Sequence, residues 1–251
     1  MKPRALIFRT AGINCDKESV HAFEMAGADV DLFHINYLKE KEIISNYQIL
    51  CIPGGFSYGD DLGAGKILSL EFSLWFKDQL HKFIDKGGLV IGICNGFQVM
   101  VKMGILPDVD FSQKVTLTEN DSARFETRWV YLKVENTSSA WLKGLANIIA
   151  LPIAHGEGKF YTDKENLVRI ESNNRVAFRY VDRCGSPVGY PLNPNGSLGG
   201  IAGITDASGR ILGLMPHPER FVFKHQHPFW MSEDHVPFGL QMFKNAVKYF
   251  E

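Results

Sequence analysis

The first hundred residues alternate between short apolar runs and longer amphipathic stretches. Apolar runs of four to six residues suit buried strands, whereas apolar residues recurring every three or four positions suit helices. Turn residues such as glycine and proline separate the two kinds of segment. The pattern predicts strands at residues 5–8, 28–33 and 48–52, a helix over 16–27, and a helix-like stretch from Leu38.

A Gly-rich loop at residues 54–65 follows the third predicted strand and leads into a helix-like segment that ends near Lys86. Residues 89–93 then form an entirely apolar run that ends at Cys94, as expected of a buried strand. Strands that alternate with helices predict an α/β fold with an open, mostly parallel sheet and helices on both faces. Ligands of such sheets bind at the carboxyl ends of the strands.

The second half of the chain is richer in strand patterns and shows neither a linker nor an internal repeat. A segment at residues 185–200, rich in Gly, Pro, Asn and Ser, is predicted to be a surface loop rather than a domain boundary. We therefore expect a single domain over residues 1–251. The predicted elements here are strands at 128–134, 176–180, 201–204 and 211–215 and a closing helix from about Pro237.

Composition and charge exclude several classes of function. The 27 basic and 28 acidic residues create no overall field that would attract nucleic acid or an anionic membrane. No stretch of about 18 apolar residues predicts a membrane span, and the amino-terminal apolar run is too short for a signal peptide. The four cysteines lack CxxC spacing, which argues against a zinc knuckle or a disulfide framework. We expect a cytoplasmic protein.

Cys94 lies between two glycines, Gly92 and Gly96, at the junction of a predicted buried strand and a predicted helix. Such a junction is typical of a nucleophile elbow, in which the chain turns sharply and exposes the reactive side chain. The helix amino terminus would favour a thiolate. The alternative is that Cys94 is a small buried apolar residue, as most free cysteines are.

A base for this thiol is available in the segment Met215-Pro216-His217-Pro218-Glu219, directly after another apolar strand. Residues two apart on an extended chain point the same way, so Glu219 is predicted to orient the imidazole of His217. A lone histidine at a strand end is more often structural, but this pairing and the elbow cysteine together predict an acyl-transfer site.

An acyl-transfer site also needs donors for the oxyanion, and backbone N–H groups of Gly55, Phe56 and Asn95 are the candidates. Gly54-Gly55 could instead form a simple tight turn. A phosphate-binding loop at residues 59–66 is excluded because Gly59 lies one position too early and Ile67 replaces the required Ser or Thr.

The motifs GICNGFQ and PHPER together resemble the class I, triad-type glutamine amidotransferases, whose flavodoxin-like sheet carries a cysteine elbow. Further motifs are similar to the amidotransferase subunits of phosphoribosylformylglycinamidine synthases, in the expected order across nearly the whole chain. These motifs are RTAGINCD from Arg9, PGGFSYGD from Pro53, HGEG from His155, NPNGS from Asn193 and IAGI from Ile201.

The resemblance implies Cys94 as nucleophile, His217 as general base and acid, Glu219 as its orienting residue and Gln98 as a contact for the substrate glutamine. It also implies a purine-biosynthetic complex in which a separate synthetase subunit binds ATP and Mg²⁺, with no cofactor in this chain. Whether a small accessory subunit joins them is left open. The loop at residues 60–66 departs from the family pattern at Gly63, which puts partner contacts there in doubt.

Three other interpretations compete with this one. A stand-alone Cys-His-Glu hydrolase or peptidase is disfavoured by the PHPE segment, and a non-catalytic regulatory module would have lost a triad residue. A metal site is a weaker hypothesis because no cysteine or repeated spacing completes the ligand set. The roles of His155, Glu157 and Arg220 stay undecided. The candidate metal ligands are His217, His225, His227 and His235.

Overall fold

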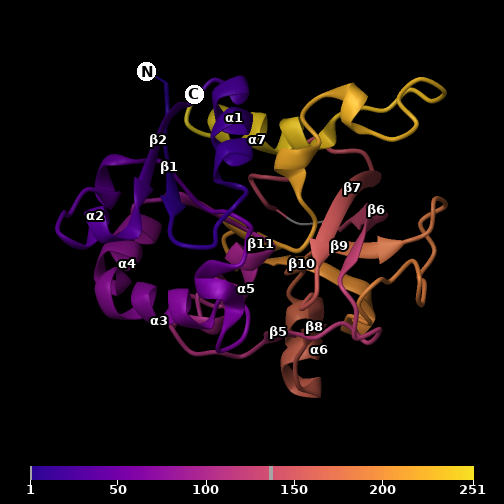
Figure 1. Ribbon diagram of the computed structural model, residues 1–251, viewed down its shortest axis with the longest axis horizontal. Helices are drawn as coiled ribbons and strands as arrows, with labels where there is room; N and C mark the ends of the chain where they lie inside the picture. Colours follow the sequence, from indigo (N-terminus) through magenta and orange to yellow (C-terminus); the bar gives the residue numbers. More distant parts are fainter. Residues whose placement is uncertain (1, 136–137) are drawn as a thin grey trace.

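The computed structural model describes residues 2–135 and 138–251, whose main feature is one twisted nine-stranded sheet (Figure 1). Five strands of this sheet are parallel and four extend it with antiparallel pairing. The parallel strands, in spatial order, are β2 (Asp29–His34), β1 (Arg4–Arg9), β3 (Ile49–Ile52), β4 (Leu89–Ile93) and β11 (Ile211–Leu214). The antiparallel strands are β10 (Ile201–Thr205), β9 (Val176–Val181), β6 (Glu126–Val134) and β7 (Ile148–His155).

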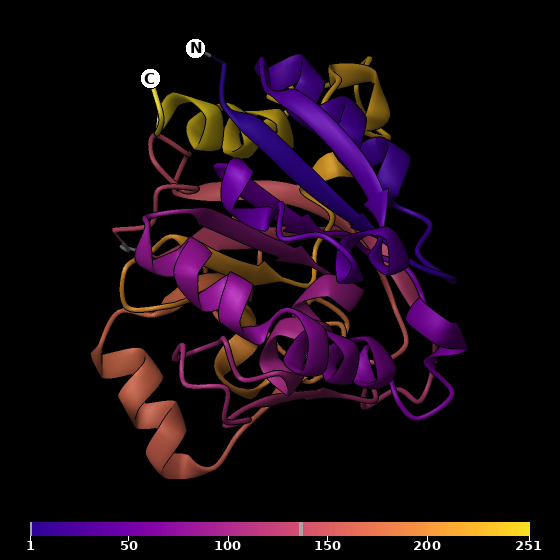
Figure 2. The same cartoon turned by 90° about the vertical axis from the view of Figure 1, so that its left-hand side faces the viewer.

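Helices cover both faces of the parallel half, which confirms the predicted α/β class (Figures 1 and 2). On one face α1 (Asp16–Ala26) packs against α7 (Phe238–Lys248), with the rings of Phe23 and Phe243 edge to face at 4.8 Å. The other face carries α3 (Lys66–Trp75), α4 (Lys77–Asp85) and α5 (Asn95–Lys102). Within the described ranges, no helix is both long and apolar enough to cross a membrane.

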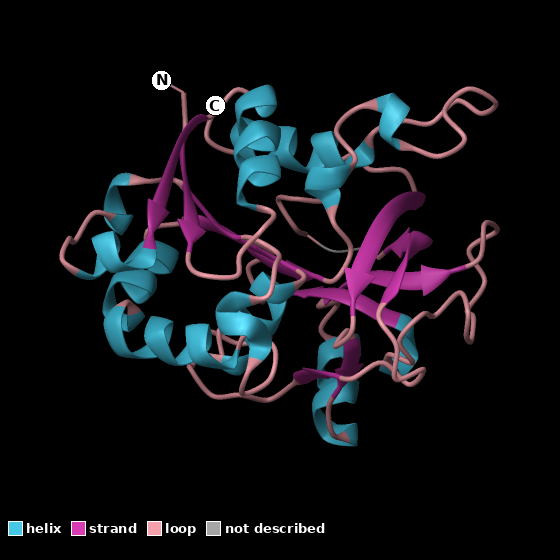
Figure 3. Cartoon of the chain, in the orientation of Figure 1, coloured by secondary structure: helices cyan, strands magenta, loops and turns pink. Residues whose placement is uncertain are grey.

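The remaining elements are short and lie around the sheet, as the secondary-structure colouring of Figure 3 shows. Helix α2 (Ile35–Lys39) follows β2 directly, and α6 (Lys164–Ser172) begins at Asp163, whose carboxylate accepts the backbone N–H of Asn166. Strands β5 (Thr116–Thr118) and β8 (Lys159–Tyr161) form a separate two-stranded sheet.

The core lies on both sides of the central strands. Every residue of β3, β4 and β11 is buried, as expected for parallel strands that helices cover on both faces. Helix α5 is also buried along nearly its whole length, from Asn95 to Val101. The segment that follows Cys94 is therefore held firmly in the middle of the molecule.

Several predicted elements differ from the structure. The single helix expected up to Lys86 is two helices, α3 and α4, which separate at the buried Phe76. Helix α2 begins at Ile35 rather than near Leu38. The pattern did not predict β7, which contains Pro152. This proline is tolerated because β7 lies at the edge of the sheet, where a missing backbone N–H removes no hydrogen bond between strands. Elements β5, β8 and α6 were not predicted either.

The segment at residues 185–200 was predicted to be a surface loop, and this is wrong for its second part. Asn193, Asn195 and Ser197 are buried, and the Asn195 amide donates to the backbone oxygen of Gly158 at 2.8 Å. Buried asparagine side chains replace the secondary-structure bonds that this segment lacks. The loop is thus part of the interior, next to the HGEG motif.

The close approach of α5 to β3 gives a testable consequence. A Cβ atom at Gly96 would overlap the backbone oxygen of Ile52, which cannot move without disturbing the sheet. We predict that Gly96→Ala lowers the free energy of unfolding by about 3 kcal/mol in urea denaturation. Gly189→Ala, where a Cβ would meet nothing within 4 Å, is the control and should change stability by less than about 1 kcal/mol. Equal effects would contradict this packing account.

Candidate active site

Three loops meet where β3, β4 and β11 end. These strands are adjacent and parallel, with Ile52 beside Gly92 and Ile93 beside Leu214. The segments that follow them therefore leave the sheet at the same edge. This edge brings together Gly54-Gly55, Cys94 and the segment from Met215 to Arg220, as the order of the strands requires.

Cys94 adopts the strained backbone conformation expected of a nucleophile elbow. Its φ is 52° and its ψ is −105°, and it forms the amino-terminal cap of α5. The Cys94 N–H donates to Leu214 O at 2.8 Å, and its Sγ lies 3.7 Å from the backbone oxygen of Ala154. A non-glycine residue held at positive φ points to a functional constraint, because the strain persists only when the surroundings enforce it.

His217 and Glu219 form a buried hydrogen-bonded pair, with 2.6 Å between Nδ1 and Oε1. Their contact was predicted from an extended segment, but Glu219 lies in a short 3₁₀ turn, Pro218–Arg220, which folds the carboxylate back onto the imidazole. The His217 N–H donates to Pro152 O at 2.8 Å and fixes the backbone. Among the described residues, neither His217 Nε2 nor Glu219 Oε2 has a hydrogen-bond partner.

The surroundings of His217 favour its charged form. Burial disfavours an imidazolium, but the Glu219 carboxylate, the Cys94 sulfur and contacts to Cys15 outweigh it and raise the pKa of His217 well above its ordinary value. Since Glu219 holds Nδ1, Nε2 is the nitrogen left to exchange a proton. His217 can therefore act as a base, and the Glu219 carboxylate stabilises the imidazolium that forms when His217 takes up a proton.

Gly54 forms the wall beside this imidazole. A Cβ atom at Gly54 would lie 2.8 Å from His217 Cε1, too close for an undisturbed ring. The glycine is therefore required for the position of His217, a role that the sequence alone did not indicate.

The predicted oxyanion donors divide into two groups. Phe56 is corrected: its N–H donates to Gly12 O at 2.9 Å, because the loop after β1 pairs with the loop after β3, and so it is not free for a ligand. The N–H groups of Gly55 and Asn95 have no acceptor among residues 2–135 and 138–251. These two remain available, and Asn95 stands at the first turn of α5, where N–H groups are unpaired.

Gln98 lies in the first turns of α5, and its amide is engaged within the protein. Its Oε1 accepts from Asn95 Nδ2 at 3.0 Å, and its Nε2 donates to the backbone oxygen of Glu157 at 2.5 Å. Asn95 Oδ1 in turn accepts the N–H of Ser57 at 3.2 Å. The two side chains tie the elbow helix to the neighbouring loops, and one Nε2 hydrogen of Gln98 is left for a ligand.

His155 braces the HGEG loop as a neutral imidazole. Its Nδ1 donates to Asn120 Oδ1 at 3.1 Å, and its Nε2 accepts from Asn195 Nδ2 at 3.5 Å. Burial is the main cause that lowers the pKa of His155 to about 3, and the charge of His217 adds to it. A proton on Nε2 would also replace the acceptor that Asn195 uses.

Glu157 holds the loop that follows β3. Its Oε2 accepts the N–H of Ala64 at 3.2 Å, and Lys102 Nζ donates to Ala64 O at 2.6 Å. Burial lowers the pKa of Lys102, while Glu157 and Asp60 oppose this effect. The loop around Ala64 is thus anchored by two side chains, Glu157 and Lys102.

Cys15 is a site neighbour that sequence reasoning missed. Its Sγ lies 3.9 Å from His217 Nδ1 and accepts from Arg220 Nη2 at 3.0 Å. The available signal was the strand order, because β1 and β3 are adjacent and the loop after β1 reaches the same sheet edge.

The described part of the chain contains one group of three side chains whose possible metal-ligand atoms lie within 4.8 Å of one another. Its members are Cys15, His217 and Glu219. Hydrogen bonds to Arg220 and between His217 and Glu219 already occupy these atoms.

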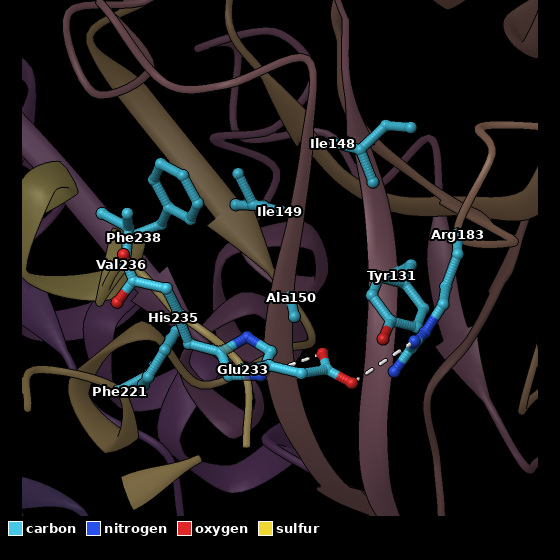
Figure 4. A pocket seen from close by; sticks show the side chains of 11 residues that line it. Tyr131, Ile148, Ile149, Ala150, Arg183, Phe221, Glu233, His235, Val236 and Phe238 are labelled. Atoms are coloured by element: carbon cyan, nitrogen blue, oxygen red, sulfur yellow. Dashed lines mark ion pairs between the residues drawn. The ribbon is translucent and has the colours of Figure 1, made fainter. Parts of the chain in front are cut away.

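The other candidate histidines do not join this group, and one of them borders a hollow of about 400 Å³ (Figure 4). His235 lines the hollow with Glu233, which lies 3.3 Å from His235 Nε2 and 3.7 Å from the guanidinium of Arg183. The ring of His227 packs against His235, whereas His225 stacks on Phe223. The structure therefore does not gather His225, His227 and His235 with His217 into one ligand set.

Comparison with known proteins agrees with this geometry. A family model described as a CobB/CobQ-like glutamine amidotransferase domain matches residues 2–250. The phosphoribosylformylglycinamidine synthase subunit PurQ of Dehalococcoides mccartyi is 49% identical over 99% of this chain and 98% of its own length. The chain belongs to this amidotransferase family. Within it, PurQ of Treponema denticola is 42% identical over 99% of both chains.

Two solved structures share this fold over nearly the whole chain. A chain in the structure of PurLQS from Thermotoga maritima matches with a TM-score of 0.79 and 32% identity, over 100% of both chains. A putative GMP synthase subunit from Thermoplasma acidophilum, at 13% identity and a TM-score of 0.59, covers 99% of this chain and 94% of its own and shares the fold alone. The fold over the full length of this chain is therefore shared with that chain of PurLQS.

The neutral state of His155 predicts a pH dependence of stability. Its pKa is about 3 in the folded protein and about 6.5 when unfolded, so below pH 6.5 only the unfolded chain takes up this proton. Between pH 6 and 4, His155 should lower the free energy of unfolding of the wild type by about 1.4 kcal/mol for each pH unit of acidification. We expect His155→Gln to lack this contribution, as urea denaturation at each pH would show. The exposed His21→Gln is the control and should follow the wild-type curve. Parallel curves for wild type and His155→Gln would show that folded His155 takes up the proton.

Proposed function

We propose that this chain is the glutaminase subunit of phosphoribosylformylglycinamidine synthase and that Cys94, His217 and Glu219 are its catalytic triad. The observation that carries this proposal is the strained Cys94 elbow, which shares one sheet edge with the hydrogen-bonded His217–Glu219 pair. Similarity to PurQ subunits over 99% of the chain supports the choice of complex. The family model's span of residues 2–250 supports a single domain.

The reaction follows from the positions of these groups. The Cys94 thiol transfers its proton to His217 Nε2, and the thiolate attacks the side-chain amide carbonyl of glutamine. His217 returns the proton to the amide nitrogen as the C–N bond breaks, which releases ammonia and leaves a γ-glutamyl thioester on Cys94. A water molecule, deprotonated by His217, then hydrolyses the thioester to glutamate and restores the thiol.

Backbone and side-chain donors near the elbow complete the proposed site. The free N–H groups of Gly55 and Asn95 are the proposed oxyanion donors, which stabilise the negative oxygen of the tetrahedral intermediates. Gln98 is proposed to contribute its remaining amide hydrogen to the substrate while it holds the neighbouring loop. Removing one such donor typically costs about a hundredfold or more in kcat.

The ammonia is used on another chain. We propose that the synthetase subunit binds ATP and Mg²⁺ and uses the ammonia to convert formylglycinamide ribonucleotide to formylglycinamidine ribonucleotide. Free ammonia would be protonated near neutral pH, so it must travel along a sheltered path to the partner. A cytoplasmic location fits this pathway and the free cysteines of the chain.

The division of labour predicts the behaviour of Cys94→Ala in the complex reconstituted with the synthetase. Glutamine-dependent synthesis should fall by at least about a thousandfold, because triad residues act as a unit. Synthesis from added ammonium salt should persist, because the synthetase site is intact. The product formed from each nitrogen source is measured side by side.

Cys184→Ala is the matched control, since it removes an exposed sulfur and should leave both activities unchanged. Glutamine-dependent synthesis by Cys94→Ala would disprove the triad. Loss of the ammonium-dependent reaction in an assembled complex would disprove the two-site model.

A further inference from the structure

Cys15 is a second buried cysteine beside the proposed base. It precedes α1 and is fully buried, and three polar groups surround its sulfur. The Sγ atom lies 3.2 Å from Asn14 Oδ1, 3.0 Å from Arg220 Nη2 and 3.9 Å from His217 Nδ1. None of the catalytic steps described above uses this sulfur.

The hydrogen bonds around Cys15 fix the direction of its proton. Asn14 Oδ1 can only accept, so the thiol donates to it, while Arg220 can only donate, so the sulfur accepts from it. Burial is the main cause that raises the pKa of the Cys15 thiol, and the group therefore stays protonated at neutral pH. Cys15 thus presents an acceptor, and no proton, toward His217.

This arrangement selects one tautomer of His217. Its Nδ1 faces two acceptors, Glu219 Oε1 at 2.6 Å and the Cys15 sulfur at 3.9 Å, so the ring proton stays on Nδ1. When His217 gives up a proton, the proton therefore leaves from Nε2, whose lone pair can then accept the proton of the Cys94 thiol, as the proposed reaction requires.

Cys15 also keeps Arg220 away from Glu219. The Oε2 atom of Glu219 is buried without a hydrogen-bond partner, and no ion pair joins it to Arg220 in the described structure. A guanidinium released from Cys15 would be drawn to this oxygen, because a buried unpaired carboxylate is costly. Such an ion pair would pull the carboxylate from the imidazole.

We propose that Cys15 is a positioning residue whose sulfur, by tethering Arg220, holds His217 and Glu219 in their productive arrangement. This inference rests on the proposed function. Cys15 and Arg220, which are 205 residues apart in the sequence, thus share one task in the glutaminase reaction.

The test measures glutamine-dependent and ammonium-dependent synthesis in the reconstituted complex. Cys15→Ala should lower kcat with glutamine about tenfold and change KM by less than about twofold, because orientation rather than binding is lost. Cys15→Ser keeps a donor and an acceptor and should restore kcat to within about threefold of wild type. Ammonium-dependent synthesis should be unchanged in both variants.

A double variant tests the tether itself. If Cys15 acts through Arg220, Cys15→Ala combined with Arg220→Ala should be no slower than Cys15→Ala alone, since no guanidinium is left to capture Glu219. Cys51→Ala is the matched control: it removes an equally buried sulfur from β3 and should lower stability without changing kcat by more than about twofold.

The outcomes separate this inference from the proposed function. Wild-type kcat in Cys15→Ala, an equal loss in Cys15→Ser, or additive losses in the double variant would each overturn the positioning role. If Cys15→Ala fails to fold, as urea denaturation would reveal, the kcat of Cys15→Ser decides. Failure of the triad would instead appear as glutamine-dependent synthesis by Cys94→Ala.

Discussion

The close approach of α5 to β3 is the constraint on which the rest of the site depends. Gly96 lies against the backbone oxygen of Ile52, and this contact allows the chain to turn from β4 into α5 within one residue. The turn places Cys94 at φ 52°. Because β11 lies beside β4 in parallel, the segment after β11 leaves the sheet at the same edge as Cys94 and places His217 there. The position of the site thus depends on a short stretch of tightly packed backbone.

The antiparallel half of the sheet supports the site rather than merely enlarging the fold. The end of β7 supplies Pro152 O, which accepts the His217 N–H, and Ala154 O, which faces the Cys94 sulfur. At the end of β7, His155 and the buried Asn195 hold the HGEG loop through hydrogen bonds of their imidazole and amide groups. Buried polar networks of this kind fix one geometry, because each unsatisfied group would be costly.

The sequence alone predicted the five parallel strands, because each is a short apolar or alternating run, but it merged α3 with α4 and misplaced the start of α2. It also indicated the elbow and the pairing of His217 with Glu219, since those depend on nearby residues. It failed for β7, whose Pro152 is tolerated only at a sheet edge, and for Phe56, whose N–H is taken by Gly12. Cys15 was missed because its contacts with His217 and Arg220 span about two hundred residues.

The central claim is that Cys94, and no other cysteine, attacks glutamine. The most direct measurement treats the complex with a glutamine analogue that carries an electrophilic ketone and locates the covalent adduct by peptide mass mapping. Cys15 and Cys51 are buried with raised thiol pKa values, and Cys184 is exposed in the turn after β9, so we predict an adduct on Cys94 that excess glutamine prevents. A glutamine-protected adduct on Cys15, Cys51 or Cys184 in place of Cys94 would contradict it.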